Sequence, residues 1–236
     1  MHPGDEALLG PPHANARARL CQPRVVTTTS GTDNRSPGRR LVLASASLGR
    51  LALMRNAGLE PAVIVSGADE TDLGTDDPRH VVATLAERKA ATVAASVRAS
   101  ASDALVVGCD SLLHVAGELH GKPISPAQAA AWWRAMRATE GDLLTGHCVI
   151  DAATGSKASD VAVTTVRFGS PTDDEIDAYV ASTEPMHVAG AFTLDGRSAP
   201  FIDGIVGDAG NVIGLSLPVL RRLLAQLGVG ITDLWR

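Results

Sequence analysis

Residues 41–50 read LVLASASLGR, an apolar run that gives way to small hydroxyl residues and then to a basic residue. The uninterrupted apolar part, residues 41–44, is typical of a short strand buried on both faces of a sheet. Residues 49–57 then fit a helix, which we expect to end near Gly58 because glycine is favoured just after a helix. A buried strand that leads directly into a helix indicates an α/β protein.

The loop between this strand and this helix brings together groups that bind phosphate. Ser45 and Ser47 supply hydroxyls, and Arg50 lies in the first helical turn. The first N–H groups of a helix have no partner within it, so they add further donors. These features fit a phosphate cradle. They also fit an ordinary serine N-cap with an arginine at the surface, and both interpretations stay open.

Strand and helix patterns alternate along the rest of the chain, and strands cluster in its second half. The expected strands are 62–65, 105–107, 143–151 and 159–168. The expected helices are 78–98, 126–137, one opened by the capping-box pattern of residues 172–175, and 218–227. This order predicts an α/β fold with a mixed sheet.

The first 40 residues differ in composition from the remainder. They are rich in Pro, Gly, Ser and Thr and carry six arginines against three acidic residues, whereas the whole chain of 236 residues has a net charge of -5. We therefore expect 1–40 to be a disordered or non-native extension and 41–236 to be the folded domain. A nucleic-acid-binding arm is the alternative, but this charge is thin and no aromatic residues are interleaved with it.

Composition also limits the setting in which the protein works. No apolar run reaches the roughly 18 residues of a membrane span, and the first 30 residues lack the apolar core of a signal peptide. Cys21, Cys109 and Cys148 match no zinc, redox or disulfide pattern. We expect a reducing, cytoplasmic location, without membrane or nucleic-acid partners.

Three charged residues stand where charge is unusual. Asp110 stands at the expected end of the strand that begins with the apolar run 105–107. A carboxylate there is costly unless it is paired, binds a metal or activates a water. Lys89 lies on the apolar stripe of helix 78–98, and Lys122 precedes Pro123, which favours extended backbone. Each also has an ordinary interpretation: a strand cap for Asp110, a snorkelling side chain for Lys89 and a solvated loop for Lys122.

Other candidate chemistries find less support. Asp69 and Glu70 follow the second strand, and one of them would be a natural second carboxylate beside Asp110, although loop acids are usually solvated. The histidines show no zinc-ligand spacing. The chain contains no P-loop, no dinucleotide-binding glycine fingerprint and no nucleophile elbow.

Taken in chain order, these motifs resemble those of one enzyme family. They are Leu43-Ala-Ser-Ala-Ser47 with Arg50, Ser66 with Asp69-Glu70, Ala86-Glu87 with Lys89-Ala90, Gly108 with Asp110-Ser111, Gly121-Lys122-Pro123, Thr145-Gly146, Glu184-Pro185 with Ala189-Gly-Ala-Phe192, and Val212-Ile-Gly-Leu-Ser-Leu-Pro218. Over residues 41–228 the chain resembles the Maf family, the septum-formation-inhibitor-like nucleotide pyrophosphatases. The first 40 residues have no counterpart in this resemblance.

The resemblance implies a two-lobed mixed α/β structure with a central cleft, often dimeric. It implies an enzyme that hydrolyses a nucleoside triphosphate to the monophosphate and pyrophosphate, with Mg²⁺ or Mn²⁺, on pyrimidine or modified nucleotides. Carried over by position, the catalytic residues would be Asp110, Lys89 and Lys122. Ser45, Ser47 and Arg50 would bind the substrate phosphates, and Asp110 and Glu70 the metal. Whether Asp110 acts as a general base or as a metal ligand stays open.

The chain departs from the family pattern at several positions. Gly49 stands where the family usually has an arginine, His187-Val188 replaces an Asp-containing pair, and Asp195 replaces a Gln or Glu. These positions resemble an actinobacterial-type variant. His187 could take the place of the family's Asp, but we expect it to be a partly buried structural residue. A nucleotide-binding regulator with little or no hydrolysis is therefore the alternative function.

Overall fold

The computed structural model describes residues 39–68, 77–100 and 103–236. Almost all of the expected extension 1–40 lies outside these residues, as do Asp69 and Glu70. Within the described ranges, no helix is both long and apolar enough to cross a membrane.

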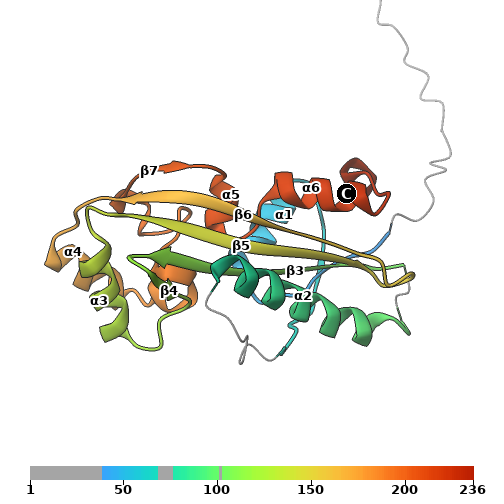
Figure 1. Ribbon diagram of the computed structural model, residues 1–236, viewed down its shortest axis with the longest axis horizontal. Coiled ribbons are helices and arrows are strands. Elements are labelled where there is room, and N and C mark those ends of the chain that lie inside the picture. Colours follow the sequence, from blue (N-terminus) through green and yellow to red (C-terminus); the bar gives the residue numbers. More distant parts are fainter. Residues whose placement is uncertain (1–38, 69–76, 101–102) are drawn as a thin grey trace, which may run out of the picture. The chain divides into compact units, whose positions relative to one another are not determined.

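A seven-stranded sheet forms the centre of the domain (Figure 1). Its order is β2-β1-β3-β5-β6-β7, and β4 pairs with β3. β1 runs parallel to both β2 and β3, and the other pairs are antiparallel, so the expected mixed sheet is confirmed. The strands are β1 Leu41–Leu43, β2 Ala62–Val63, β3 Leu105–Val115, β4 Glu118–His120, β5 Glu140–Asp151, β6 Lys157–Phe168 and β7 Ile202–Val206.

The helices begin where the sequence supplies caps. Ser47, Ser125 and Ser216 each accept a hydrogen bond from a backbone N–H in the first turn of the helix that follows. Thr172 and Glu175 form the expected capping box. The helices are α1 Leu48–Asn56, α2 Pro78–Val97, α3 Pro126–Met136, α4 Asp173–Ala181, α5 Ala209–Ile213 and α6 Leu217–Gln226, with 3-10 turns η1 Glu184–His187, η2 Ala189–Ala191, η3 Ala199–Phe201 and η4 Ile231–Leu234.

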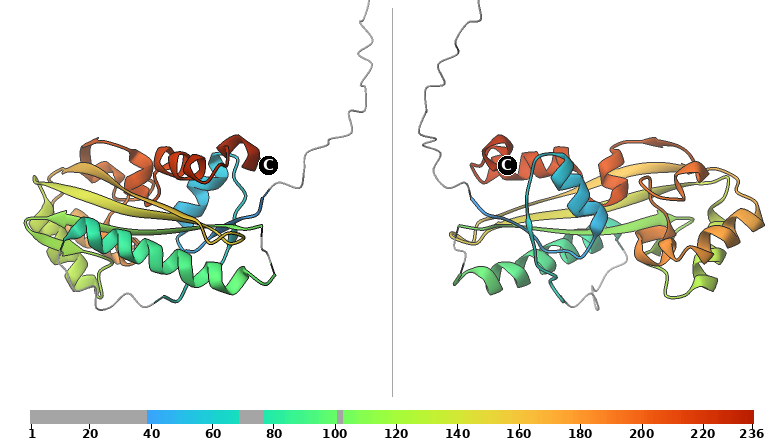
Figure 2. Two further views of the ribbon diagram at one scale, coloured as in Figure 1. Left: turned by 45° about the vertical axis from the view of Figure 1, so that its right-hand side comes forward. Right: turned by 180° about the vertical axis from the view of Figure 1, so that it is seen from behind.

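Helices cover both faces of the sheet and form two halves along it. α2 lies on one face, where residues such as Val93 pack against Val106 and Cys148. α1 and α6 lie together on the other face, as the view from behind shows (Figure 2), and Met54 and Leu220 belong to their shared core. α3 and α4 pack at the other end of the sheet (Figure 1), around Trp133.

The structure corrects the expected extent of β3. The sequence places the end of this strand at Gly108-Cys109-Asp110, but β3 continues to Val115, so Asp110 lies in its middle. The reason is non-local: β5 pairs with β3 from Leu105↔Asp151 to His114↔Asp142. A polar interruption in an apolar run therefore marks a site within the strand, not its end.

Candidate active site

A cleft of about 600 Å³ opens on the edge of β3. On that edge, β1 pairs with Leu105–Val107 and β4 with Leu113–Val115, so among the described strands none pairs with residues 108–112 there. The C-terminal end of β1 leads directly into the cleft. In α/β sheets, ligands bind where neighbouring strands diverge at their carboxyl ends.

Two oppositely charged side chains meet in this cleft. The Lys89 Nζ on α2 donates to the Asp110 Oδ1 on β3 at 2.5 Å. Their side chains are only 13% and 11% exposed. The apolar stripe that carries Lys89 thus borders the cleft, and the lysine does not snorkel to open solvent.

Two glycines allow α2 to approach the sheet closely enough for this ion pair. A Cβ at Gly108 would lie 2.3 Å from the Ala86 carbonyl oxygen, and one at Gly146 would lie 2.1 Å from that of Val82. Gly108 and Asp110 share a face of β3, because alternate residues of a strand point the same way. The backbone of α2 therefore packs directly against the backbone of β3 at Gly108, two residues before the carboxylate that Lys89 binds.

Arg50 is buried at the start of α1, with 9% of its surface exposed. Its Nε donates to the Gly214 carbonyl oxygen at 2.7 Å, Nη1 to the Ser45 Oγ at 3.0 Å and Nη2 to the Ser111 Oγ at 2.9 Å. The surface-arginine interpretation is therefore wrong. The N-cap interpretation is right for Ser47, whose Oγ accepts from the Arg50 N–H at 3.3 Å.

Lys122 enters the cleft from the loop after β4. The Gly190 N–H donates to the Gly121 carbonyl oxygen at 2.9 Å, which ties this loop to η2. The Trp133 indole in turn donates to the Ala191 carbonyl oxygen at 2.8 Å. Backbone contacts thus hold the loop that presents the exposed Lys122.

Six of the seven residues proposed for the site line this one cleft: Ser45, Ser47, Arg50, Lys89, Asp110 and Lys122. The seventh, Glu70, lies outside the described residues. Their chemical roles remain predictions.

The structure adds residues to which the sequence assigned no role. Ser111 and Thr145 form a hydrogen-bonded pair, and Ser111 also accepts from Arg50. Their only signal in the sequence is that they belong to the Asp110-Ser111 and Thr145-Gly146 motifs. His187 is exposed and lines the cleft, so the expectation that it is partly buried is wrong. At Gly49, a Cβ would lie 2.9 Å from the Ile213 Cγ2, so Ile213 fills the space beside the position where the family has an arginine.

The donors among the described residues of the cleft suit one type of metal site better than another. Asp110 is the sole carboxylate among the described lining residues, and the described part of the chain holds no group of three or more His, Cys, Asp or Glu that could bind a metal. Zinc sites need three or four protein ligands, whereas Mg²⁺ is commonly held by one or two carboxylates together with substrate phosphates and waters. The residues present therefore fit a cation that arrives with a phosphorylated substrate.

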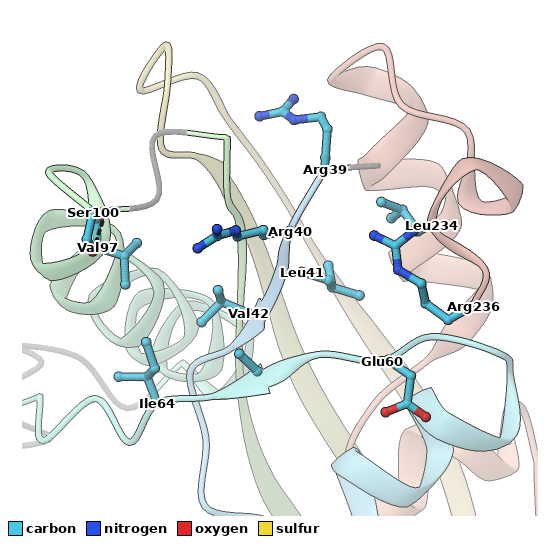
Figure 3. A pocket seen from close by; sticks show the side chains of 11 residues that line it. Arg39, Arg40, Leu41, Val42, Glu60, Ile64, Val97, Ser100, Leu234 and Arg236 are labelled. Atoms are coloured by element: carbon cyan, nitrogen blue, oxygen red, sulfur yellow. Dashed lines mark hydrogen bonds between the residues drawn. The ribbon is translucent and has the colours of Figure 1, made fainter. Parts of the chain in front are cut away.

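A second hollow, of about 330 Å³, lies at the N-terminal end of β1 (Figure 3). Three arginines surround its apolar residues, but Arg39 donates to Asp151 at 2.6 and 3.1 Å, and the Arg40 Nε lies 3.8 Å from Asp103. None of the predicted site residues lines it. The cleft, not this hollow, is the candidate active site.

Comparisons with known proteins agree with this geometry. The family model described as Maf-like protein matches residues 40–227. A Streptomyces coelicolor protein is 62% identical over 84% of this chain and 96% of its own length, and a Nocardia farcinica protein is 49% identical over 83% and 96%. Both are named nucleoside triphosphate pyrophosphatase, and their organisms agree with the actinobacterial-type pattern. This chain belongs to the Maf family.

Proposed function

We propose that this protein is a nucleoside triphosphate pyrophosphatase that hydrolyses (d)NTP to (d)NMP and pyrophosphate. The observation that supports this best is the cleft itself, which is lined by three cationic side chains, Arg50, Lys89 and Lys122, and by one carboxylate among its described residues, Asp110. The names of the relatives favour hydrolysis over the alternative of a nucleotide-binding regulator.

The cationic residues would hold the substrate. A nucleoside triphosphate carries about four negative charges, which exceed the three positive charges of the cleft and leave room for a divalent cation. In the reaction a water oxygen bonds to the α-phosphorus, and the bond from that phosphorus to the α–β bridging oxygen breaks. The leaving group departs as pyrophosphate, and the water proton passes to a base.

Asp110 is the residue to which we assign the reacting end of the substrate. Its carboxylate, held by Lys89, either accepts the proton of the attacking water or binds the cation. Lys89 fixes its orientation in both cases. Mg²⁺ or Mn²⁺, when bound, would neutralise phosphate charge and polarise the α-phosphorus.

The experiment measures pyrophosphate release from dTTP, UTP, CTP, 7-methyl-GTP and hypermodified pyrimidine nucleotides across a range of Mg²⁺ and Mn²⁺. We expect turnover of at least one of them, lost in Asp110→Asn. If Asp110 is a metal ligand, the variant needs more metal. If it is the base, the variant stays slow at saturating metal.

A purified protein that binds nucleotide in the presence of metal but releases no pyrophosphate over hours would instead support the regulator. A homodimer is part of the proposal, and analytical ultracentrifugation of the purified chain tests it. Non-canonical or modified nucleotides are included among the proposed substrates because Gly49, His187 and Asp195 depart from the family pattern.

A further inference from the structure

The guanidinium of Arg50 is held by neutral oxygens alone. Its three hydrogen-bond partners are a carbonyl and two hydroxyls, and among the described residues no carboxylate lies within ion-pair distance of it. A buried cation without a counter-charge is costly. This charge therefore favours an anion in the cleft. Three of its five N–H donors bind these protein oxygens, and the other two are left to reach a phosphate.

The hydroxyl of Ser45 has a defined direction because of this arrangement. Its Oγ accepts from the Ser47 backbone N–H at 3.2 Å and from the Arg50 Nη1 at 3.0 Å. A hydroxyl has two lone pairs and one hydrogen, so both acceptor positions are filled. The O–H of Ser45 is left to donate, and Ser45 lines the cleft.

The hydroxyl of Ser111 has a defined direction as well. It accepts from the Arg50 Nη2 at 2.9 Å and lies 2.9 Å from the Thr145 Oγ1. Thr145, completely buried, donates its single hydrogen to the Asn211 carbonyl oxygen at 3.1 Å. Ser111 must therefore donate to Thr145, which makes a directed series from Arg50 through Ser111 and Thr145 to the Asn211 carbonyl.

We propose that Arg50, Ser111 and Thr145 are positioning residues that orient the Ser45 hydroxyl as a hydrogen-bond donor to a phosphate oxygen. This inference rests on the proposed function and extends it. Phosphate oxygens only accept hydrogen bonds, so a serine locked as a donor binds them better than one free to rotate. Because both lone pairs of Ser45 are occupied, Ser45 is neither a metal ligand nor a nucleophile.

The most informative substitution is Thr145→Val, at a completely buried position. It keeps the shape of the side chain but breaks the hydrogen-bond series at its buried end. We expect it to lower kcat/KM about tenfold, the effect of one neutral hydrogen bond, and Thr145→Ser to recover most of this loss. Ser45→Ala should cause a similar loss. Because both act on one hydrogen bond, the double variant should be no worse than Ser45→Ala alone.

The matched control is Thr165→Val on β6. Thr165 donates to Asp142 at 2.7 Å and does not line the cleft, so its loss removes a comparable hydrogen bond without touching the series. We expect an unchanged kcat/KM for this control. Equal effects of the two valine variants, or losses from Thr145→Val and Ser45→Ala that multiply fully, would overturn the inference.

Calorimetric binding of inorganic tripolyphosphate separates this inference from the proposed function. If the wild type binds it with the same coupling between positions 45 and 145 yet hydrolyses no nucleotide, the function is wrong and the positioning role stands. If nucleotides are hydrolysed but Thr145→Val changes neither kcat/KM nor tripolyphosphate affinity, the positioning role is wrong. A wild type that neither hydrolyses nucleotides nor binds tripolyphosphate contradicts both.

Discussion

Loss of Lys89 or Asp110 alone should destabilise the fold more than apolar replacement of both. Removal of one partner from an almost buried ion pair leaves the other charge in poor solvent and commonly costs about 3 kcal/mol, whereas apolar replacement of both is far milder. We expect Lys89→Met to lower the free energy of unfolding by roughly that amount and to abolish turnover. Lys89→Met/Asp110→Leu should be the more stable of the two variants, although equally inactive. Urea unfolding of both variants measures this, and a double variant less stable than the single one would refute it.

His147 should make the stability of the fold depend on pH. Burial lowers the pKa of His147 to about 4, with Arg50 adding to the effect, and its Nε2 accepts the Ser216 N–H at 2.8 Å. Between pH 6.5 and about 4 the unfolded chain therefore binds a proton that the folded chain does not. The contribution of His147 to the free energy of unfolding is therefore fully present above pH 6.5. It falls with decreasing pH by up to about 1.4 kcal/mol per pH unit.

Urea unfolding between pH 4.5 and 7.5 measures this slope. We expect His147→Gln, which keeps an acceptor but no titrating group, to show a shallower dependence than the wild type. The Arg39 side chain lowers the pKa of Asp151, so that carboxylate loses its contribution only below its usual value of 3.8, outside the measured range. Parallel slopes for wild type and variant would exclude His147 as the source.

Among single residues, the sequence identified those whose charge conflicts with their surroundings. Asp110 within an apolar run and Lys89 on an apolar stripe are both of this kind, and both line the cleft. Ser111 and Thr145 raised no such conflict, because hydroxyl residues are common within strands. Their importance arises from partners 61 and 34 residues away, which local patterns cannot show.

At the scale of elements, the contact between α2 and β3 sets the geometry of the ion pair. A Cβ at Gly108 would also lie 2.7 Å from the Ala90 backbone nitrogen, so Gly108→Ala must displace α2 on either side of Lys89. Overpacking of this kind costs about 1–3 kcal/mol. We expect a lower melting temperature together with a large loss of kcat.

Gly204→Ala on β7 is the matched control, because its new Cβ would meet only the flexible end of the Arg167 side chain at 2.8 Å. We expect it to retain full kcat. Calorimetry and steady-state kinetics on both variants make the comparison. If Gly108→Ala kept wild-type kcat, close packing of α2 would not be what places Lys89.

Elements with local signals were predicted well, and those with distant partners were not. Serine and threonine caps located the starts of α3 and α4 because a cap acts within one helical turn. The second half of β3 escaped prediction because Asp110 and Ser111 interrupt its apolar run and its partners on β5 are distant along the chain. Its local partner β4 was missed too, because a strand of three residues has no recognisable pattern. The 3-10 turns η1 and η2, which contribute His187 and Ala189 to the cleft, have no distinctive periodicity.

For the whole molecule, we propose that residues 1–38 are dispensable for the fold and for activity. The three core clusters of the described domain draw their residues from Leu41 onwards, and the family model begins at residue 40. Deletion of residues 1–38 keeps Arg39, which binds Asp151. We expect an unchanged melting temperature and an unchanged kcat/KM, and a marked fall in either would show that the extension belongs to the working protein.

β3, β5 and β6 each run through both halves of the sheet, with 11, 12 and 12 residues. Any line that divides the halves must therefore cut three paired strands, and within these strands no loop interrupts the described chain to act as a hinge. Neither half is expected to fold as a fragment, and the domain should melt in one cooperative step whose calorimetric and van't Hoff enthalpies agree. Any movement of one half relative to the other would therefore have to bend or twist these three strands.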